Sequence, residues 1–427
     1  MLVVGAGLAG AEAAYYLARR GIPVLLAEMK PNKKTPAHTS DNFAELVCSN
    51  SLKSDDVNGN ACGLLKEEMR RLGSVTMAAA ERARVPAGGA LAVDREKFSA
   101  YITETLKKEK NITVLSREQT ELPEEGIIAT GPLTSDALYR AISKKFGQAL
   151  HFFDASAPIV SKESIDFSRV FTGDRYGKGT GDYLNCPLDK EEYEAFVCAL
   201  LNAERATLHE FEKGEIFEGC MPVEVMASRG RDTLRFGTLK PVGLCGADGK
   251  RPYAVLQLRK ENAEGSAYGL VGCQTNLKFG EQKRVFSLIP ALANAEFLRY
   301  GVMHRNTYLQ SPEVLEADYS VKGQPLLFFA GQMTGVEGYV ESAASGLYAA
   351  IMAERKLKGK PPVSLSGRTV MGALANYVSA PNAHFEPMNA NYALLEGGFQ
   401  EIRDKKERRK MLAMRSLNEV ERFGALL

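Results

Sequence analysis

The chain has 427 residues, of which 45% are hydrophobic and 25% charged, and its formal net charge is +2. This length predicts two or three domains, and the near-neutral charge excludes a strongly basic or acidic protein. No apolar run is long enough to cross a membrane, and the chain opens on a strand and a glycine turn without a signal-peptide pattern, so we expect a cytoplasmic protein. Seven cysteines without a C-x-x-C pair and five scattered histidines favour neither a disulfide framework nor a metal site.

The first 28 residues contain a short apolar strand, a glycine-rich turn, a helix and a second strand. The strand at residues 2–4 leads into G-x-G-x-x-G, a helix continues over 11–19, and the second strand ends at Glu28. Glycines at these positions permit the tight turn, the approach of a pyrophosphate and close packing of the helix, while an acid at position 28 suits ribose hydroxyls. We therefore expect a dinucleotide to contact Gly5, Ala6, Gly7, Leu8, Ala9, Gly10 and Glu28.

Two later stretches favour FAD over NAD as that dinucleotide. Residues 127–130 form a predicted strand that ends at Gly131, and residues 326–330 form another that leads through Gly331 and a glycine-rich turn into a long helix. The small residues 343–346 near the start of that helix could admit a ligand or a close strand. Flavoproteins bring a second helix N-terminus to the flavin in this way, and no second G-x-G-x-x-G follows a strand to make a nicotinamide domain.

The middle of the chain differs in character from its two ends. Short strand patterns such as "PYAVLQLRK" alternate with turns and helical segments. The sequence therefore predicts an α/β fold in which residues 1–150 and 301–427 form one discontinuous, Rossmann-like FAD-binding domain. Residues 151–300 are expected to form an inserted α+β substrate domain.

Two cysteines lie in unusual surroundings. Cys48 lies in a polar, turn-rich stretch over residues 30–62, which is long for a loop unless it is functional. Cys220 lies in "EIFEGCMPVE", between a glycine and a Met-Pro pair. Packing is the ordinary role of an unpaired cysteine, and we expect that role for the other five, which are Cys62, Cys186, Cys198, Cys245 and Cys273.

Two basic segments could bind RNA or be solvated helix faces. One is "SRGRDTLRFGTLK", with Arg229, Arg231, Arg235 and Lys240, and the other is "RDKKERRKMLAMR" near the C-terminus.

Several blocks of sequence resemble one known family. "VCSNSLKS", "RVPAGGALAVDREKFS", "FEGCMPVE", "LVGCQTNLKFGEQKRVFSLIP", "RYGVMHRNTYL" and "GVEGYVESAASGL" are similar to the folate- and FAD-dependent tRNA methyltransferases, TrmFO. The resemblance runs from the first glycine turn to near residue 390. The family is itself similar to MnmG, a flavoprotein that modifies the wobble uridine.

The resemblance implies the reaction and its cofactors. The family makes 5-methyluridine at position 54 in the T-loop of tRNA, taking the carbon from 5,10-methylenetetrahydrofolate and using FAD with NAD(P)H as reductant. The partners implied are therefore the T-arm of tRNA and the folate, while the apolar runs, cysteines and histidines of the sequence predict no membrane and no metal.

The resemblance also implies roles for particular residues. Cys220 is expected to attack C6 of the uracil as a thiolate, and Cys48 to remove the proton from C5, although the two roles could be exchanged. His304 is expected to lie against the folate pterin, with Tyr339 as a second flat surface. Gly338 and Ser342 belong to the block that leads into the flavin helix and are expected cofactor contacts.

Other functions remain open from the sequence. One is a related flavoenzyme acting on ribosomal RNA or on another tRNA uridine, as MnmG does. Others are an FAD oxidoreductase without an RNA partner and a catalytically idle RNA-binding flavoprotein.

Overall fold

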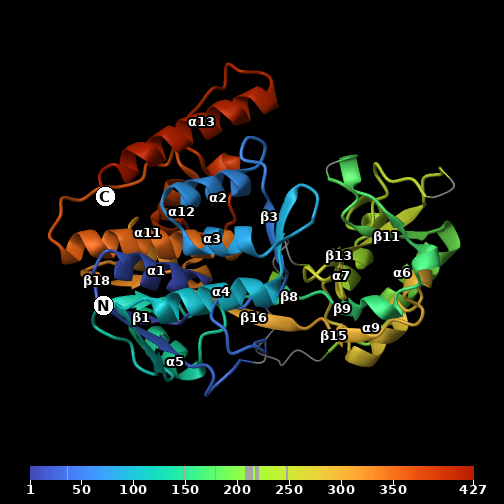
Figure 1. Ribbon diagram of the computed structural model, residues 1–427, viewed down its shortest axis with the longest axis horizontal. Coiled ribbons are helices and arrows are strands. Elements are labelled where there is room, and N and C mark those ends of the chain that lie inside the picture. The colour runs from blue at the N-terminus through green and yellow to red at the C-terminus, as the bar shows by residue number, and fades with distance from the viewer. Residues whose placement is uncertain (36, 148–149, 178, 207–214, 217–220, 247–248) are drawn as a thin grey trace.

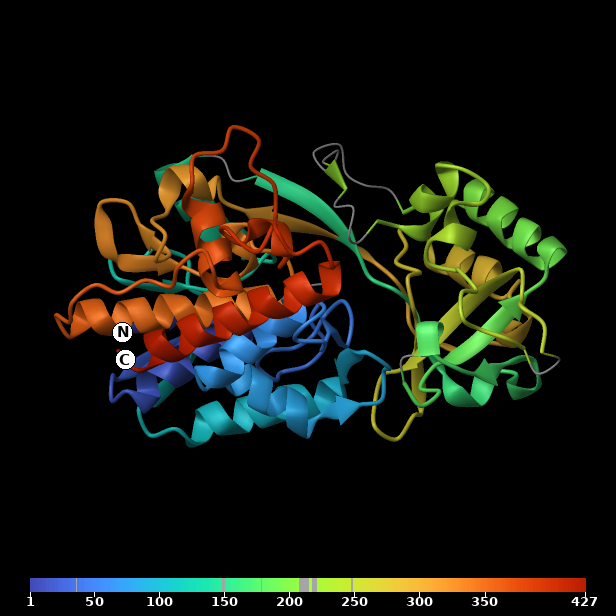
Figure 2. The ribbon, with the colours of Figure 1, turned by 90° about the horizontal axis from the view of Figure 1, so that it is seen from above.

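The computed structural model describes residues 1–427 except 36, 148–149, 178, 207–214, 217–220 and 247–248, and only the backbone of 150–154, 215–216 and 304–305. Figure 2 shows two lobes, joined by strands that run from one to the other. Each lobe has its own hydrophobic core: one draws on residues from both ends of the chain, and the other on residues 160–295.

The first lobe is built on a six-stranded sheet of order β17-β18-β7-β1-β2-β6. Its strands are β1 (Leu2–Val4), β2 (Val24–Glu28), β6 (Ile112–Ser116), β7 (Gly126–Ile128), β17 (Ser320–Val321) and β18 (Gln324–Phe329). All neighbouring pairs are parallel except β17 with β18. Strand β18 pairs directly with β7, so the sheet combines the start of the chain with a segment from its last third. The α/β, Rossmann-like fold class is confirmed.

Helices pack around this sheet (Figure 1). They are α1 (Leu8–Arg19), α2 (Ala61–Arg71), α3 (Val75–Arg82), α4 (Arg95–Lys108), α5 (Asp136–Phe146), α10 (Ser311–Val314), α11 (Tyr339–Leu357), α12 (Val370–Ser379) and α13 (Lys405–Gly424). Helix α1 begins three residues earlier than the sequence predicts, directly after Gly7.

Small residues bring α1 and α11 together. A Cβ on Gly346 would lie only 2.1 Å from the carbonyl oxygen of Ala9. The expectation that residues 343–346 admit a ligand or a strand is therefore wrong at Gly346, because its neighbour is the helix α1.

Buried carboxylates hold several helix ends. Glu68 of α2 accepts hydrogen bonds from the backbone N–H groups of Val370 and Met371, at 2.7 and 2.8 Å, and from the hydroxyl of Ser416 in α13. It thereby caps the N-terminus of α12, whose first amides have no partner within the helix.

The second lobe contains a six-stranded sheet of order β10-β11-β13-β14-β9-β15. Its strands are β9 (Ile159–Ser161), β10 (Phe171–Thr172), β11 (Leu184–Leu188), β13 (Ala254–Lys260), β14 (Ala267–Leu270) and β15 (Phe297–Arg299), all joined antiparallel. The described helices that accompany it are α6 (Lys190–Asn202), α7 (Val223–Ser228), α8 (Thr233–Phe236) and α9 (Phe279–Phe286).

Two small sheets lie near the junction of the lobes. One is formed by β12 (Glu215–Ile216), β8 (Leu150–Ala155) and β16 (Met303–Tyr308), and the long strands β8 and β16 connect the lobes (Figure 2). The other is formed by β3 (Ser51–Ser54), β5 (Ala90–Val93) and β4 (Arg84–Val85). Strand β3 follows Cys48 closely, so this sheet fixes one end of the cysteine-bearing loop.

Candidate active site

The three glycines of the turn between β1 and α1 each occupy a position where a side chain would be unfavourable, for different reasons. Gly5 has φ +92°, and a Cβ there would lie 2.7 Å from the carbonyl oxygen of Ala129. A Cβ on Gly10 would lie 1.8 Å from the carbonyl oxygen of Gly5, so that position is closed by the turn itself. A Cβ on Gly7, in contrast, would meet no protein atom within 4 Å. The absence of a side chain at Gly7 therefore leaves open space, as the approach of a phosphate requires.

Glu28 closes the turn from the end of β2. Its two carboxylate oxygens accept hydrogen bonds from the backbone N–H groups of Ala6 (2.8 Å) and Lys30 (3.0 Å). The side chain is 7% exposed. These bonds fix the carboxylate beside the turn, at the place where the sequence predicts a ribose contact.

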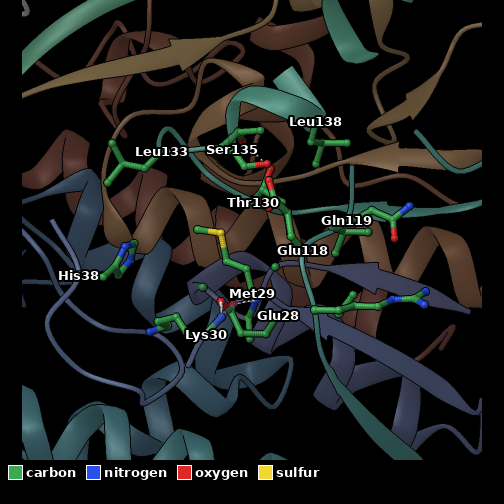
Figure 3. Close-up of a pocket in the computed structure, with 18 of the residues that line it drawn as sticks. Glu28, Met29, Lys30, His38, Glu118, Gln119, Thr130, Leu133, Ser135 and Leu138 are labelled. Carbon is green, nitrogen blue, oxygen red and sulfur yellow. Dashed lines mark hydrogen bonds between the residues drawn. The ribbon is translucent and has the colours of Figure 1, made fainter. Parts of the chain in front are cut away.

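A pocket of about 670 Å³, a volume that includes its open mouth, lies over this turn. Figure 3 shows Glu28 and Lys30 across it from Leu133 and Leu138. Burial and the neighbouring Lys30 hold the pKa of His38, which also lines the pocket, below its ordinary value. The dimensions and mixed lining are typical of a cofactor site.

The remaining predicted cofactor glycines lie at strand ends and at the start of α11. Gly131, Gly331 and Gly338 have φ values of +69°, +83° and +120°, which favour glycine over residues with a Cβ. The N–H of Gly331 donates to the hydroxyl of Ser345, which in turn donates to the carbonyl oxygen of Ser342. Gly331 and Ser342 are thus parts of one turn-to-helix junction.

A second cavity of about 920 Å³ adjoins the first, since Leu133 lines both. Cys48, Gly338 and Tyr339 line this second cavity. Two regions that lie almost 300 residues apart in the sequence therefore meet here.

Tyr339 holds the Cys48 loop through its hydroxyl group. The hydroxyl oxygen accepts hydrogen bonds from the backbone N–H groups of Cys48 (2.6 Å) and Ser49 (3.3 Å). Burial raises the pKa of Tyr339, so the hydroxyl stays protonated. The residue expected to be a flat surface for the folate thus has a direct contact with the predicted catalytic loop.

Arginines hold the same loop through its carbonyl oxygens. Arg95 donates to the carbonyl oxygens of Leu46 (2.6 Å) and Cys48 (3.2 Å), and Arg299 donates to that of Val47 (2.6 Å). Burial by itself would lower the pKa of Arg95. The carboxylate of Glu261, 2.8 Å from Nε of Arg95, has the larger effect, so the pKa is raised.

A third arginine, Arg259 of β13, donates to the hydroxyl of Ser49 (2.8 Å) and to the side-chain oxygen of Asn50 (2.7 Å). Arg259 and Arg299 belong to the second lobe, whereas Arg95 and Tyr339 belong to the first. Residues of both lobes therefore fix the backbone around Cys48.

An ion pair with one buried member, between Lys53 and Glu341, lies against the glycine at position 338. Nζ of Lys53 lies 2.9 Å from Oε1 of Glu341, and the Glu341 side chain is fully buried. A Cβ on Gly338 would lie 2.3 Å from a carboxylate oxygen of Glu341 and 2.7 Å from Nζ of Lys53. Burial by itself would lower the pKa of Lys53, but the negative charge of Glu341 has the larger effect, and the pKa is raised. The Lys53 side chain therefore stays a charged ammonium in the wall of the second cavity.

A third cavity of about 520 Å³ also borders the cysteine loop. It is bordered by Arg95, Arg259 and Glu261, and it shares Cys48, Ser49 and Gln274 with the second cavity. Cys48 thus lines both of these cavities.

Two of the predicted site residues cannot be placed fully. Cys220 lies outside the described residues. His304 lies in β16, paired with Asp154 of β8, and its side chain is not described.

The other cysteines divide into two groups. Cys62, Cys186 and Cys273 are buried, as expected for packing, and burial raises the pKa of Cys62 to about 11. Cys198 and Cys245 are exposed. The packing role predicted for those two is therefore wrong, because their positions in helical and turn patterns did not reveal which side faces solvent.

The sequence did not reveal the groups that hold the cysteine loop. Arg95, Arg259 and Arg299 act across long separations in the chain, and no local pattern marks them. Among the described residues there is no cluster of ligating side chains suited to a metal ion and no helix suited to crossing a membrane.

Known proteins match this chain over nearly its whole length. A TrmFO of Lactobacillus acidophilus, named methylenetetrahydrofolate–tRNA-(uracil-5-)-methyltransferase, is 57% identical, covering 99% of this chain and 97% of the relative. The chain belongs to the TrmFO family. A TrmFO of Acetivibrio thermocellus is also 57% identical, over 97% of this chain and 96% of the relative.

The wider family is also shown. The model of glucose inhibited division protein A matches residues 1–361, so this TrmFO family member also belongs to the GidA family. Among solved structures, GidA of Aquifex aeolicus has a TM-score of 0.71 at 17% identity, covering all of this chain and 73% of that one. At this identity the likeness concerns the fold alone.

Proposed function

We propose that the protein methylates C5 of uridine 54 in the T-loop of tRNA, with 5,10-methylenetetrahydrofolate as carbon donor and FAD with NAD(P)H as reductant. The observation that carries the proposal is the cavity lined by Cys48, Gly338 and Tyr339, which adjoins the glycine-turn pocket. The names of relatives that are 57% identical over almost the entire chain support the proposal, since they give methylenetetrahydrofolate as donor and the 5-position of uracil in tRNA as target.

The residues of the first pocket fit FAD. Gly7 leaves open space at the N-terminus of α1, where the free N–H groups favour a pyrophosphate. The turn would hold the cofactor through Gly5, Ala6, Gly7, Leu8, Ala9 and Gly10, with Glu28 at the ribose and Gly131, Gly331, Gly338 and Ser342 toward the flavin. FAD, when bound, supplies the reducing electron pair that a methylene group needs to become a methyl group, and NAD(P)H restores that pair.

Cys220 would provide the covalent step on uracil. C5 of uracil is a weak nucleophile until a thiolate adds to C6. The S–C6 bond then forms while the C5–C6 π electrons move onto C5 and O4, so that C5 can accept the one-carbon unit. The bond to Cys220 breaks again when the C5 proton leaves.

Cys48 would accept that C5 proton. Its loop is fixed by hydrogen bonds from Arg95 and Arg299 and by those to Tyr339, so the Cys48 sulfur, which would take the proton as a thiolate, is held in a constant position beside a uracil bound in the cavity. Positioning of this kind is what general acid–base catalysis requires.

Folate and RNA would enter the same region. We assign the pterin to the second cavity, with His304 and Tyr339 as its expected contacts, because that cavity borders both Cys48 and the start of α11. The inserted lobe, residues 151–300, is assigned to the RNA.

Methyl transfer to a tRNA transcript tests the proposal. Labelled methylenetetrahydrofolate with NAD(P)H should label the transcript, whereas labelled S-adenosylmethionine should not. Nucleoside mapping should place the label at uridine 54. Labelling of ribosomal RNA alone would assign the enzyme to a different target, and labelling from S-adenosylmethionine without folate would refute the proposal.

Two sets of variants separate the cofactor from the chemistry. Gly7→Val should fold normally, since the position is open, and should lose flavin. RNA containing 5-fluorouracil at the target should be trapped covalently by the wild type and by Cys48→Ala but not by Cys220→Ser. Trapping that survives in Cys220→Ser and disappears in Cys48→Ala would exchange the two assignments.

A further inference from the structure

The residues shared by the second and third cavities mark where a target base would lie. Cys48, Ser49 and Gln274 are the described residues that line both. On the proposed function, a base that exchanges its C5 proton with Cys48 must reach this junction. The junction therefore contains the groups that can recognise the base.

The charged groups around the junction are already engaged. Arg95 bonds to Glu261 and to the loop carbonyls, and Arg259 bonds to Ser49 and Asn50. The side-chain amide of Gln274, in contrast, forms no hydrogen bond with any residue that the structure describes. Among the described residues at the junction, Gln274 offers a neutral amide that can both donate to a ligand and accept from it.

The backbone of Gln274 connects it to the second predicted cysteine. Its carbonyl oxygen accepts a hydrogen bond of 2.7 Å from the N–H of Val223. Val223 opens α7 and lies three residues after Cys220 in the sequence. Gln274 is thus attached to the segment that follows Cys220 while it lines the cavities beside Cys48.

The amide matches the edge of uracil. Uracil presents an N3–H donor between the O2 and O4 acceptors, and a glutamine amide offers one acceptor and two donors. Enzymes that act on a flipped base read this edge by hydrogen bonds. A donor at O4 has a second effect, because O4 gains negative charge when a thiolate adds to C6.

We infer that Gln274 binds the target uracil at this junction, accepting from N3–H and donating to O4. The inference rests on the proposed function for the identity of the base. It assigns Gln274 both to base binding and to stabilising the charge that develops during the reaction.

Removal of the base's N3–H tests the contact directly. The affinity of the protein for RNA with uridine or N3-methyluridine at the target is measured for the wild type and for Gln274→Ala. We expect the N3-methyl group to weaken wild-type binding roughly 10- to 100-fold and Gln274→Ala binding less than about 3-fold. Effects of N3-methylation on the RNA itself cancel in this comparison, because they are present with both proteins.

Methyl transfer tests the contact to O4. Gln274→Ala should lower kcat/KM roughly 100-fold, and Gln274→Glu should lower it further, since a carboxylate repels the charge on O4. Flavin content and NAD(P)H oxidation without RNA should stay at wild-type levels in both variants. Gln400→Ala, a change at an exposed glutamine near the C-terminus, is the matched control and should change none of these quantities.

The outcomes separate the inference from the proposed function. An equal N3-methyl penalty in the wild type and in Gln274→Ala would overturn the role of Gln274 even if methyl transfer occurs. Loss of flavin or of NAD(P)H oxidation in Gln274→Ala would overturn it too, by placing the amide at the cofactor. A difference in the N3-methyl penalty without any methyl transfer would support base binding by Gln274 and refute the proposed reaction.

Discussion

Replacement of Gly346 by alanine should both destabilise the protein and loosen its cofactor. The added Cβ would lie 2.1 Å from the carbonyl oxygen of Ala9 and 2.6 Å from its Cα, whereas ordinary contacts begin near 3.4 Å. Helices α1 and α11 would have to separate by roughly 1 Å, and overpacking of this kind costs about 1–3 kcal/mol. Because both contacting groups are backbone atoms, no side chain can rotate away, so we expect the upper part of that range.

The same shift would reach the glycine turn. Helix α1 begins at Leu8, directly after Gly7, so its displacement moves the amides that would hold the pyrophosphate. We expect flavin occupancy after purification to fall several-fold and the free energy of unfolding to fall by about 2–3 kcal/mol.

Flavin absorbance per protein and denaturant unfolding with excess FAD and without it measure the two effects. Gly280→Ala is the matched control: no atom lies within 4 Å of that Cβ, and the change in an exposed helical position should stabilise the protein by about 0.5–1 kcal/mol. Wild-type flavin content and unfolding midpoint in Gly346→Ala would refute the close approach of the two helices.

Three further predictions follow from buried or surface charges. Burial raises the pKa of Glu68 to about 7, above its value in the unfolded chain. The contribution of Glu68 to the free energy of unfolding is therefore complete below the unfolded pKa and is lost as pH rises through about 7. Glu68→Gln should flatten this part of the pH dependence of the unfolding free energy. Arg95→Met should lower methyl transfer at least 10-fold with flavin content unchanged, because Glu261 and the loop carbonyls lose their partner; normal transfer would show that the arginine is dispensable. Arg231→Gln should reduce by about 1 the slope of the logarithm of the tRNA affinity against the logarithm of salt concentration. Arg235→Gln should mainly lower stability, since the Arg235 guanidinium lies 4.1 Å from the centre of the Tyr253 ring. An unchanged slope in Arg231→Gln would place the phosphate contact at another residue.

The sequence predicted the cofactor end of the fold well because its signals are local. The strand at Leu2–Val4 has the predicted bounds, and β2 ends at Glu28 as expected. The start of α1 was predicted three residues late, because the last residues of the glycine motif, Leu8 to Gly10, are already helical. The later strands and α11 were found from apolar runs and glycine-rich turns, and TrmFO membership came from longer blocks.

The surroundings of Cys48 could not be predicted in the same way. Arg95, Arg259, Arg299 and Tyr339 reach the loop from four separate parts of the chain, and their bonds to backbone atoms leave no residue pattern in the loop. The role of Gly346 was misjudged for a related reason: small residues in a helix show that something lies close, but not whether it is a ligand, a strand or another helix. The assigned roles of Cys220 and His304 and the domain boundaries stay predictions.

The pairing of β7 with β18 sets an order of events during protein synthesis. Strand β7 is complete at Ile128, but its sheet neighbour β18 ends only at Phe329. At 5–20 residues per second, the ribosome takes roughly 10–40 s to make the intervening chain, and during this time one side of β7 lacks its neighbour. The second lobe, whose core draws on residues 160–295 alone, can fold within that interval. Cofactor loading must then await α11, so a nascent chain interrupted before Gly338 would contain the nucleotide turn and a folded insertion but no complete flavin site.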